Sequence, residues 1–252
     1  MSADHPTGTA RTICFAVRRA AVVELPIIIA ATFVPPVTVL IKQHGMSSLP
    51  PEHTTRDEFK LTGIHRAYWL SLIVGITCIV FQVTDLVEPL RFSRPQINDG
   101  QWWRLLTGNL VHLGYPHLLL NLAGLAVISL LLAPAMKAWQ WALTALASMA
   151  GVGVGLLLFD PELSWYVGLS GVLYGLLLGG AIAEFRSQKV IATLLIIYTV
   201  GKIIWEQIYG AVESSEKITG GNVIVNAHLY GMICGGLAAL LLVTICRRKK
   251  HD

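Results

Sequence analysis

The chain contains 252 residues, of which 54% are hydrophobic and only 13% are charged, and its formal net charge is +4. Soluble domains usually carry about 25% charged residues, so this composition excludes an ordinary soluble globular protein. A chain this apolar is expected to span a membrane. We therefore expect the lipid bilayer to surround it, and we expect no nucleic acid partner.

The first 60 residues are predicted to be an N-terminal extension and linker. Residues 20–41 are apolar enough for a span, but one glutamate and three prolines interrupt them. Basic residues precede this run as in a signal segment, yet no small-residue cleavage site follows it. We expect residues 1–60 to be poorly ordered or interfacial, with an extra span or a start at Met46 as the alternatives. Residues 61–252 are expected to form one helical domain.

Six apolar segments follow, each about as long as the 20 residues that a helix needs to cross a bilayer. They predict an all-α fold, a polytopic membrane protein built as a bundle of six transmembrane helices. The segments are residues 67–87, 111–133, 139–159, 165–183, 190–209 and 224–245.

Basic residues predict the orientation of this bundle. By the positive-inside rule, Lys and Arg beside apolar spans mark the cytoplasmic side, so we expect both termini in the cytoplasm. The loop of residues 88–109 lies on the opposite side in this topology although it contains three arginines. It also holds Trp102 and Trp103, which are typical of a membrane interface, so we expect it to lie on the bilayer surface. The cytoplasmic basic residues are 247–250, Arg186, Lys189 and Lys137.

The sequence contains no nucleotide, haem or metal signature, so we expect no cofactor and no metal site. Its four cysteines lack any paired spacing, and three of them fall in or at the end of apolar spans. This favours a packing role over disulfides or metal ligation. The cysteines are Cys14, Cys78, Cys234 and Cys246.

A serine and a histidine interrupt two of the apolar segments. Ser170 lies in the Gly-Leu-Ser-Gly motif at 168–171, and His228 lies early in the last span. Spans two, four and six run in the same direction, so both residues share one depth with His117 and Asn121 of span two. At 1.5 Å rise per residue, that depth is within about two turns of the outer surface. Ionisable groups inside a membrane mark functional sites.

Glycines repeat every four residues beside both polar side chains. Small residues at this spacing allow helix backbones to approach closely in lipid. If spans four and six pack through them, Ser170 and His228 come within hydrogen-bonding distance. A hydroxyl nucleophile beside an imidazole base predicts hydrolysis of peptide bonds within the membrane. The glycines are Gly171, Gly175 and Gly179 after the serine, and Gly231 and Gly235 after the histidine.

At these residues the sequence resembles the rhomboid family of intramembrane serine proteases, which are six-helix bundles with a Ser-His dyad. The resemblance runs over residues 102–235. Its motifs are Trp-Arg at 103–104, His117 with Asn121, Gly-Leu-Ser-Gly with Tyr174, and Ala-His followed by Gly231 and Gly235.

Within the family the sequence is most similar to the rhombosortases, judged by residues 101–109, 165–167 and 205–207. Rhombosortases are thought to process bacterial proteins with a C-terminal tail of a Gly-Gly motif, an apolar helix and a basic cluster. The resemblance thus implies membrane-anchored substrates with a C-terminal transmembrane tail. It also implies a bacterial inner membrane, with the active site opening toward the periplasmic face.

The resemblance further implies a role for each matching residue. Ser170 would be the nucleophile, and His228 the general base that later protonates the leaving amine. Asn121, His117 and the backbone N–H of Ser170 would form the oxyanion hole, and Tyr174 would pack against the ring of His228. The family pattern requires no third carboxylate, and none occurs in spans four or six. The supporting glycines would be Gly168, Gly171, Gly231 and Gly235.

Span five adds a separate feature. Lys202 and Glu206 are four residues apart in an apolar helix, so they are predicted to pair in or near the interface. A structural ion pair is one interpretation. The other is a substrate gate that involves Trp205 and Glu206.

Other functions compete with the sorting protease. A general rhomboid would cut ordinary single-span proteins, and an inactive rhomboid-like protein would bind membrane clients without cutting them. The intact Ser170 and His228 argue against the inactive form. A transporter is disfavoured because the chain has no internal repeat. Metallo- and aspartyl proteases are disfavoured because His-Glu-x-x-His is absent and because Asp85 and Asp160 fall near span ends.

Overall fold

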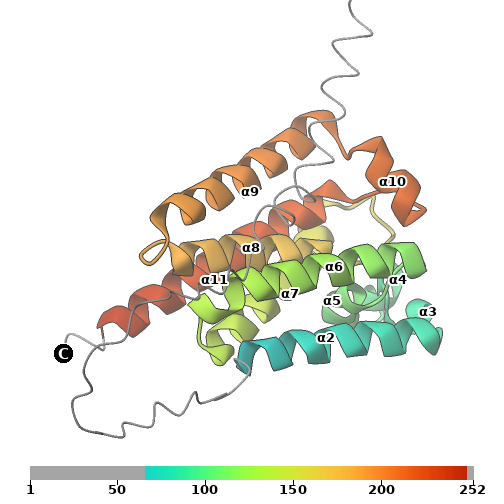
Figure 1. The fold of residues 1–252 in the computed structure, drawn as a ribbon. Helices are drawn as coiled ribbons and strands as arrows, with labels where there is room; N and C mark the ends of the chain where they lie inside the picture. The colour runs from blue at the N-terminus through green and yellow to red at the C-terminus, as the bar shows by residue number, and fades with distance from the viewer. Residues whose placement is uncertain (1–65, 249–252) are drawn as a thin grey trace, which may run out of the picture. The chain divides into compact units, whose positions relative to one another are not determined.

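The computed structural model describes residues 66–248. The predictions for the N-terminal extension, for Cys14 and for residues 249–250 lie outside this range. Within it the chain is helical apart from one pair of two-residue strands (Figure 1). The prediction of an all-α, polytopic membrane protein is confirmed.

Six apolar helices form the bundle. Five of them are long and apolar enough to cross a membrane, and the sixth, α8, has 15 residues. The six are α2 (Arg66–Val83), α6 (Tyr115–Leu132), α7 (Ala138–Phe159), α8 (Ser170–Glu184), α9 (Lys189–Tyr209) and α11 (Val225–Arg248). The connecting elements are α3 (Val87–Leu90), β1 (Phe92–Ser93), α4 (Arg94–Asn98), α5 (Arg104–Thr107), η1 (Gly108–Leu110), η2 (Ala133–Ala135), β2 (Trp165–Tyr166) and α10 (Glu213–Thr219).

The fourth predicted span begins later than expected. Residues 165–183 were predicted to be helical, but α8 starts at Ser170. The difference arises because β2 pairs antiparallel with β1, with Tyr166 opposite Phe92 and Trp165 opposite Ser93. As a result, Ser170 is the first residue of its helix rather than a residue one turn inside it.

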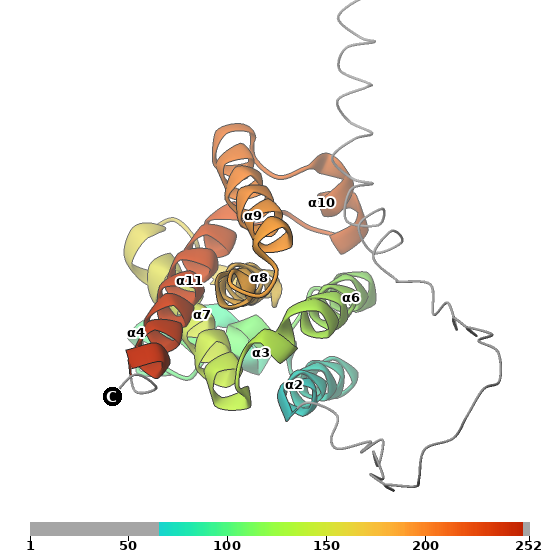
Figure 2. The same ribbon diagram turned by 60° about the vertical axis from the view of Figure 1, so that its left-hand side comes forward.

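Helix α8 occupies the centre of the bundle. It packs against α6, α7, α9 and α11, and Figure 2 shows it nearly end-on among them. Every residue of α8 is buried or half-buried. A helix that is apolar all round belongs in a core rather than on a surface, so the longer helices shield α8 from lipid.

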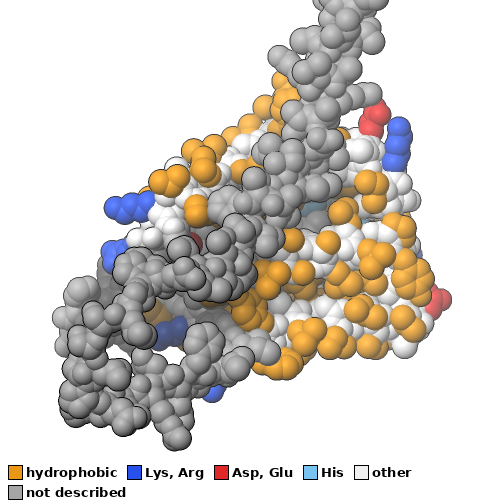
Figure 3. Space-filling model, in the orientation of Figure 1, with side chains coloured by type: hydrophobic (Ala, Val, Ile, Leu, Met, Phe, Trp, Pro, Cys, Tyr) orange, Lys and Arg blue, Asp and Glu red, His pale blue; other side chains and the backbone are white. Residues whose placement is uncertain are grey.

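The outer helices carry large hydrophobic side chains on their outward faces. Ile73 of α2 is 58% exposed, Leu119 of α6 is 63% exposed and Leu194 of α9 is 61% exposed. Figure 3 shows hydrophobic side chains over the visible face of α2 and α6. A soluble monomer rarely exposes so much contiguous apolar surface. This surface therefore fits an integral membrane protein whose outer face contacts lipid.

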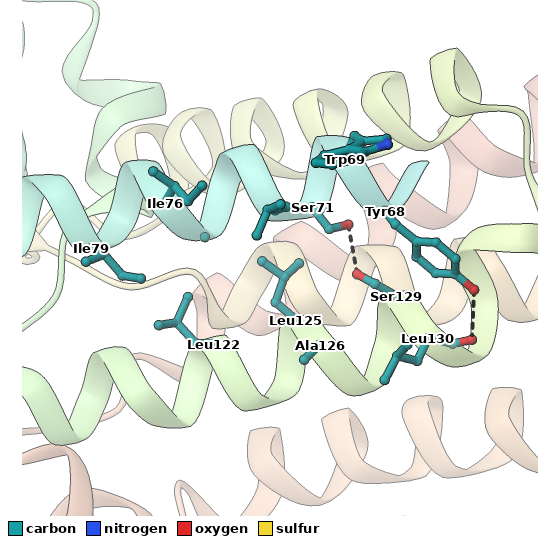
Figure 4. A pocket seen from close by; sticks show the side chains of 12 residues that line it. Tyr68, Trp69, Ser71, Ile76, Ile79, Leu122, Leu125, Ala126, Ser129 and Leu130 are labelled. Atoms are coloured by element: carbon teal, nitrogen blue, oxygen red, sulfur yellow. Dashed lines mark hydrogen bonds between the residues drawn. The ribbon is translucent and has the colours of Figure 1, made fainter. Parts of the chain in front are cut away.

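A polar cluster joins α2 to α6 and α7 inside this apolar shell. Ser129 Oγ donates a hydrogen bond to Ser71 Oγ at 2.8 Å, and Trp141 Nε1 donates to the same oxygen at 3.0 Å. Beside the cluster, an apolar groove of about 510 Å³ lies between α2 and α6, lined by residues such as Ile76 and Leu122 (Figure 4). Hydrogen bonds between helices contribute about 0.6 kcal/mol each on average in a membrane, so these two bonds add modestly to the attachment of α2 beside the groove.

Two arginines fix the connection between α2 and α6. Arg94 donates to four backbone carbonyls at and just beyond the end of α7, and Arg104, which is 5% exposed, donates to two carbonyls of the preceding loop. A cation at a helix C-terminus satisfies carbonyls that have no partner in the helix. These charges are therefore used inside the fold, whereas Trp102 and Trp103 stay more than half exposed. The carbonyls that Arg94 binds, at 2.7–2.9 Å, belong to Leu156, Leu157, Asp160 and Leu163.

Candidate active site

The structure brings together the serine and the histidine of the two motifs. Ser170 begins α8, and His228 lies in the first turn of α11. Ser170 Oγ is 2.8 Å from His228 Nε2, and His228 is only 5% exposed. A serine hydroxyl that donates to an imidazole nitrogen can lose its proton to that nitrogen as it attacks a carbonyl. The arrangement therefore has the geometry that a nucleophile and its base require.

The backbone before Ser170 is held in place from two sides. The N–H of Gly168 donates to the carbonyl of Gly108 at 3.1 Å, and the Tyr166 hydroxyl donates to the carbonyl of Gly168 at 2.7 Å. Gly168 has φ +128°, a conformation that favours glycine. A Cβ atom there would also lie 2.8 Å from Cε1 of His117. Glycine at 168 is therefore required both by the backbone and by the neighbouring ring.

Helices α8 and α11 approach each other through their glycines. A Cβ atom on Gly171 would lie 2.6 Å from the carbonyl oxygen of Ala227, and one on Gly235 would lie 2.7 Å from Cα of Gly175. A Cβ atom on Gly231 would collide with the backbone of Gly171. Real Cβ atoms essentially never come within 3.0 Å of such neighbours. The close contact that places His228 beside Ser170 thus depends on the absence of side chains.

Tyr174 lies one turn after Ser170 and packs on the imidazole. The centroids of the Tyr174 and His228 rings are 4.7 Å apart, with an interplanar angle of 41°. Aromatic rings at this separation attract each other and restrict rotation. The tyrosine therefore limits the orientations open to His228.

The residues predicted for the oxyanion hole, His117 and Asn121, both lie on α6. His117 is beside Gly168, and its Nδ1 receives a long contact of 3.5 Å from the N–H of Leu113. The Asn121 amide donates to the carbonyl of His117 at 3.0 Å. Within residues 66–248, neither side chain is hydrogen-bonded to Ser170. The amide nitrogen of Asn121 carries two N–H groups, so the bond to His117 leaves one donor for another partner.

A buried carboxylate also reaches the histidine. Glu206 of α9 is 4% exposed, and its Oε1 receives a hydrogen bond from Lys202 Nζ. Its Oε2 lies 2.8 Å from His228 Nδ1. The sequence spacing identified the pairing of Lys202 with Glu206, but it carried no signal for the contact with His228, which depends on how α9 packs beside α11. Trp205 faces outward, where it is 40% exposed and stacks on Tyr209.

A second contact missed by sequence analysis anchors the start of α11. Asp160, at the end of α7, accepts hydrogen bonds from the Asn226 amide and from the Tyr230 hydroxyl, the latter at 2.7 Å. These two donors flank His228 in the sequence. Asp160 therefore fixes the turn of helix that presents the histidine.

Within the described part of the chain, the structure shows neither a disulfide bond nor a cluster of metal-binding side chains. Cys78, Cys234 and Cys246 are free thiols. Over residues 66–248, no group of three or more His, Cys, Asp or Glu side chains is arranged to hold a metal ion.

Comparison with known proteins identifies the family. Residues 99–245, more than half of the chain, match the Rhomboid domain. Over 167 residues the chain is 30% identical to "Putative rhomboid protease YdcA" of Bacillus subtilis (strain 168), an alignment that covers 62% of this chain and 72% of that protein. The matched region includes both motifs and all the helices that contribute to the site. The chain belongs to the rhomboid family of intramembrane serine proteases.

Proposed function

We propose that Ser170 is the nucleophile and His228 the general base with which this intramembrane protease cleaves membrane-anchored proteins. The observation that carries the proposal is the 2.8 Å separation of Ser170 Oγ and His228 Nε2. As Oγ attacks the scissile carbonyl carbon, its proton passes to Nε2. The same proton is then given to the leaving amine, and water repeats the cycle on the acyl-enzyme.

The developing oxyanion would be stabilised at the start of α8. The first N–H groups of a helix have no partner within it, and Ser170 is the first residue of α8. His117 would support the same site, because its Nε2 is the ring nitrogen near Gly168 and would be a donor when it carries the proton. Asn121 would add a third donor through the second N–H of its amide. Loss of one such donor typically reduces the rate about a hundred- to a thousandfold.

The substrate class that we propose is a membrane-anchored protein whose C-terminal tail has a Gly-Gly motif, an apolar helix and a basic cluster. This proposal is supported by the resemblance to rhombosortases at residues 101–109, 165–167 and 205–207. In keeping with that resemblance, we place the protein in a bacterial inner membrane. A sorting protease of this kind would release its substrate on the periplasmic side.

The proposed orientation has both termini in the cytoplasm and the active site toward the periplasm. It is supported by the basic residues beside spans two to six and by the engagement of Arg94 and Arg104 with backbone carbonyls. Both arginines bind backbone carbonyls within the protein, so neither is a free charge of the loop.

A general rhomboid protease is the second candidate, because the relative from Bacillus subtilis is named as a rhomboid protease without a sorting role. An inactive client-binding protein is the third, and the intact hydrogen-bonded pair of Ser170 and His228 argues against it.

A co-expression experiment separates these candidates. Wild type, Ser170→Ala and His228→Ala are each expressed with a reporter that carries the Gly-Gly tail, with the same reporter carrying Ala-Ala, and with a plain single-span substrate. We expect wild type alone to cleave the Gly-Gly reporter and to lose activity on Ala-Ala. Equal cleavage of all three substrates would reject the sorting role. No cleavage by well-inserted wild type would reject the protease assignment of the dyad.

A further inference from the structure

Each ring nitrogen of His228 has its own partner from a different helix. Nε2 faces Ser170 Oγ of α8 and Nδ1 faces Glu206 Oε2 of α9, both at 2.8 Å. The histidine itself is on α11. Serine, histidine and glutamate therefore form one continuous chain of hydrogen bonds across three helices.

The second oxygen of Glu206 is not explained by an ion pair within α9. Lys202 binds only Oε1, and the side chain directs Oε2 across to α11. A carboxylate inside an apolar helix is costly unless it is paired and hydrogen-bonded. Here both requirements are met, because Lys202 supplies the opposite charge and His228 supplies a hydrogen bond. The position serves the histidine as well as the lysine.

The contact determines which tautomer His228 adopts. An ionised carboxylate is only an acceptor, so Nδ1 must carry the proton that it donates to Oε2. Nε2 is then unprotonated and can accept the proton of Ser170. When that proton arrives, the positive charge on the imidazole lies next to the carboxylate, which stays ionised throughout.

We propose that Glu206 is a positioning residue that completes a Ser170–His228–Glu206 triad, with Lys202 holding the carboxylate in place. The inference rests on the proposed roles of Ser170 and His228. It replaces the gate interpretation for Glu206, since a 4% exposed side chain directed at His228 has no free surface for a substrate.

Other charged and titratable groups face this cluster. They are Tyr174 and Tyr198, near the Glu206 carboxylate, and His117 of α6, near His228. None of them provides a second acceptor for Nδ1. Removal of the Glu206 carboxylate would therefore leave the tautomer of His228 unspecified.

The test compares kcat and KM of wild type, Glu206→Gln, Glu206→Asp and the double variant Lys202→Gln/Glu206→Gln on one membrane-anchored substrate. Glu88→Gln is the matched control, since Glu88 is also paired, with Arg91, but is 68% exposed and far from the dyad in sequence. We expect Glu206→Gln to reduce kcat at least about 100-fold, and up to ~10⁴-fold as in other triads, with little change in KM. Glu206→Asp should recover part of kcat, and Glu88→Gln should match wild type.

The double variant distinguishes a triad from an ion pair. It removes the half-buried ammonium and the buried carboxylate at once, so it inserts without an unpaired lysine and guards against a folding failure of Glu206→Gln. The triad predicts that its kcat stays low, whereas a purely structural pair predicts recovery to the wild-type value. Recovery, or a wild-type kcat for Glu206→Gln, would overturn the inference. When one of these two outcomes is found, Ser170→Ala shows which claim has failed. If Ser170→Ala cleaves at the wild-type rate, the proposed function itself is wrong; if it is inactive, only the role of Glu206 is wrong.

Discussion

The contact between Gly171 and Ala227 provides a sharp test of how the site is assembled, because these residues adjoin Ser170 and His228. In Gly171→Ala the new Cβ atom would lie 2.6 Å from the carbonyl oxygen of Ala227, about 0.8 Å short of ordinary van der Waals contact at 3.4 Å. The neighbour is backbone, which cannot rotate away as a side chain can. Helices α8 and α11 must therefore separate by several tenths of an ångström to 1 Å.

Two consequences of that separation can be measured. Overpacking of this kind costs about 1–3 kcal/mol of stability. A displacement of about 1 Å between reacting groups can reduce a rate by ~10²-fold, so we expect kcat to fall between about tenfold and about a hundredfold. The variant is assayed by thermal unfolding in detergent and by steady-state cleavage of a membrane-anchored substrate.

Gly201→Ala is the matched control. Gly201 lies within α9, and a Cβ atom there would meet nothing within 4 Å. Alanine favours a helix over glycine by up to about 1 kcal/mol, so this variant should be as stable as wild type or more stable, with unchanged kcat. Wild-type stability and kcat in Gly171→Ala would refute the claim that bare backbone contact sets the distance from Ser170 to His228.

Three further substitutions test separate parts of the account. Arg94→Gln loses the cation that binds the carbonyls at the end of α7 and should lower the free energy of unfolding by about 2 kcal/mol or more, as measured by denaturation in detergent; an unchanged value would mean that these bonds do not stabilise the loop. Ser71→Ala leaves the buried indole N–H of Trp141 without its acceptor and should cost about 1–3 kcal/mol, while kcat stays at the wild-type level because the cluster makes no hydrogen bond to Ser170 or His228; a lower kcat would contradict that independence. Gly168→Ala forces an L-residue into φ +128° and crowds His117, so it should reduce kcat more than Gly171→Ala does. A wild-type kcat for Gly168→Ala would show that the loop before Ser170 tolerates other conformations.

The sequence was sufficient to predict the helical bundle because an apolar segment of about 20 residues is typical of a transmembrane helix. It also indicated which polar residues belong together, since spans that run in one direction bring Ser170, His228 and His117 to one depth. Glycine spacing predicted the contact between α8 and α11, because only small residues allow such an approach.

The sequence was insufficient wherever long-range packing decided the outcome. The start of α8 depends on the pairing of Trp165 and Tyr166 with β1, a contact between segments more than 70 residues apart. Lys202 and Glu206 formed a recognisable pair, yet only the packing of α9 beside α11 directs the second carboxylate oxygen to His228.

The partners of the arginines in the α2–α6 connection were also beyond the sequence, for the same reason. Arg94 and Arg104 look in the sequence like free surface charges that oppose the predicted topology. In the structure both bind backbone carbonyls of other segments. A rule that counts charges cannot tell a solvated arginine from one that caps a helix.

The most direct test of the central claim is the site of covalent labelling by a fluorophosphonate, which reacts with activated serines. Purified wild type is labelled and digested, and the modified peptide is identified by mass spectrometry, with His228→Ala treated in parallel. The account predicts a single adduct on Ser170 that is lost in His228→Ala. An adduct on another serine, or equal labelling of Ser170 in both proteins, would contradict it.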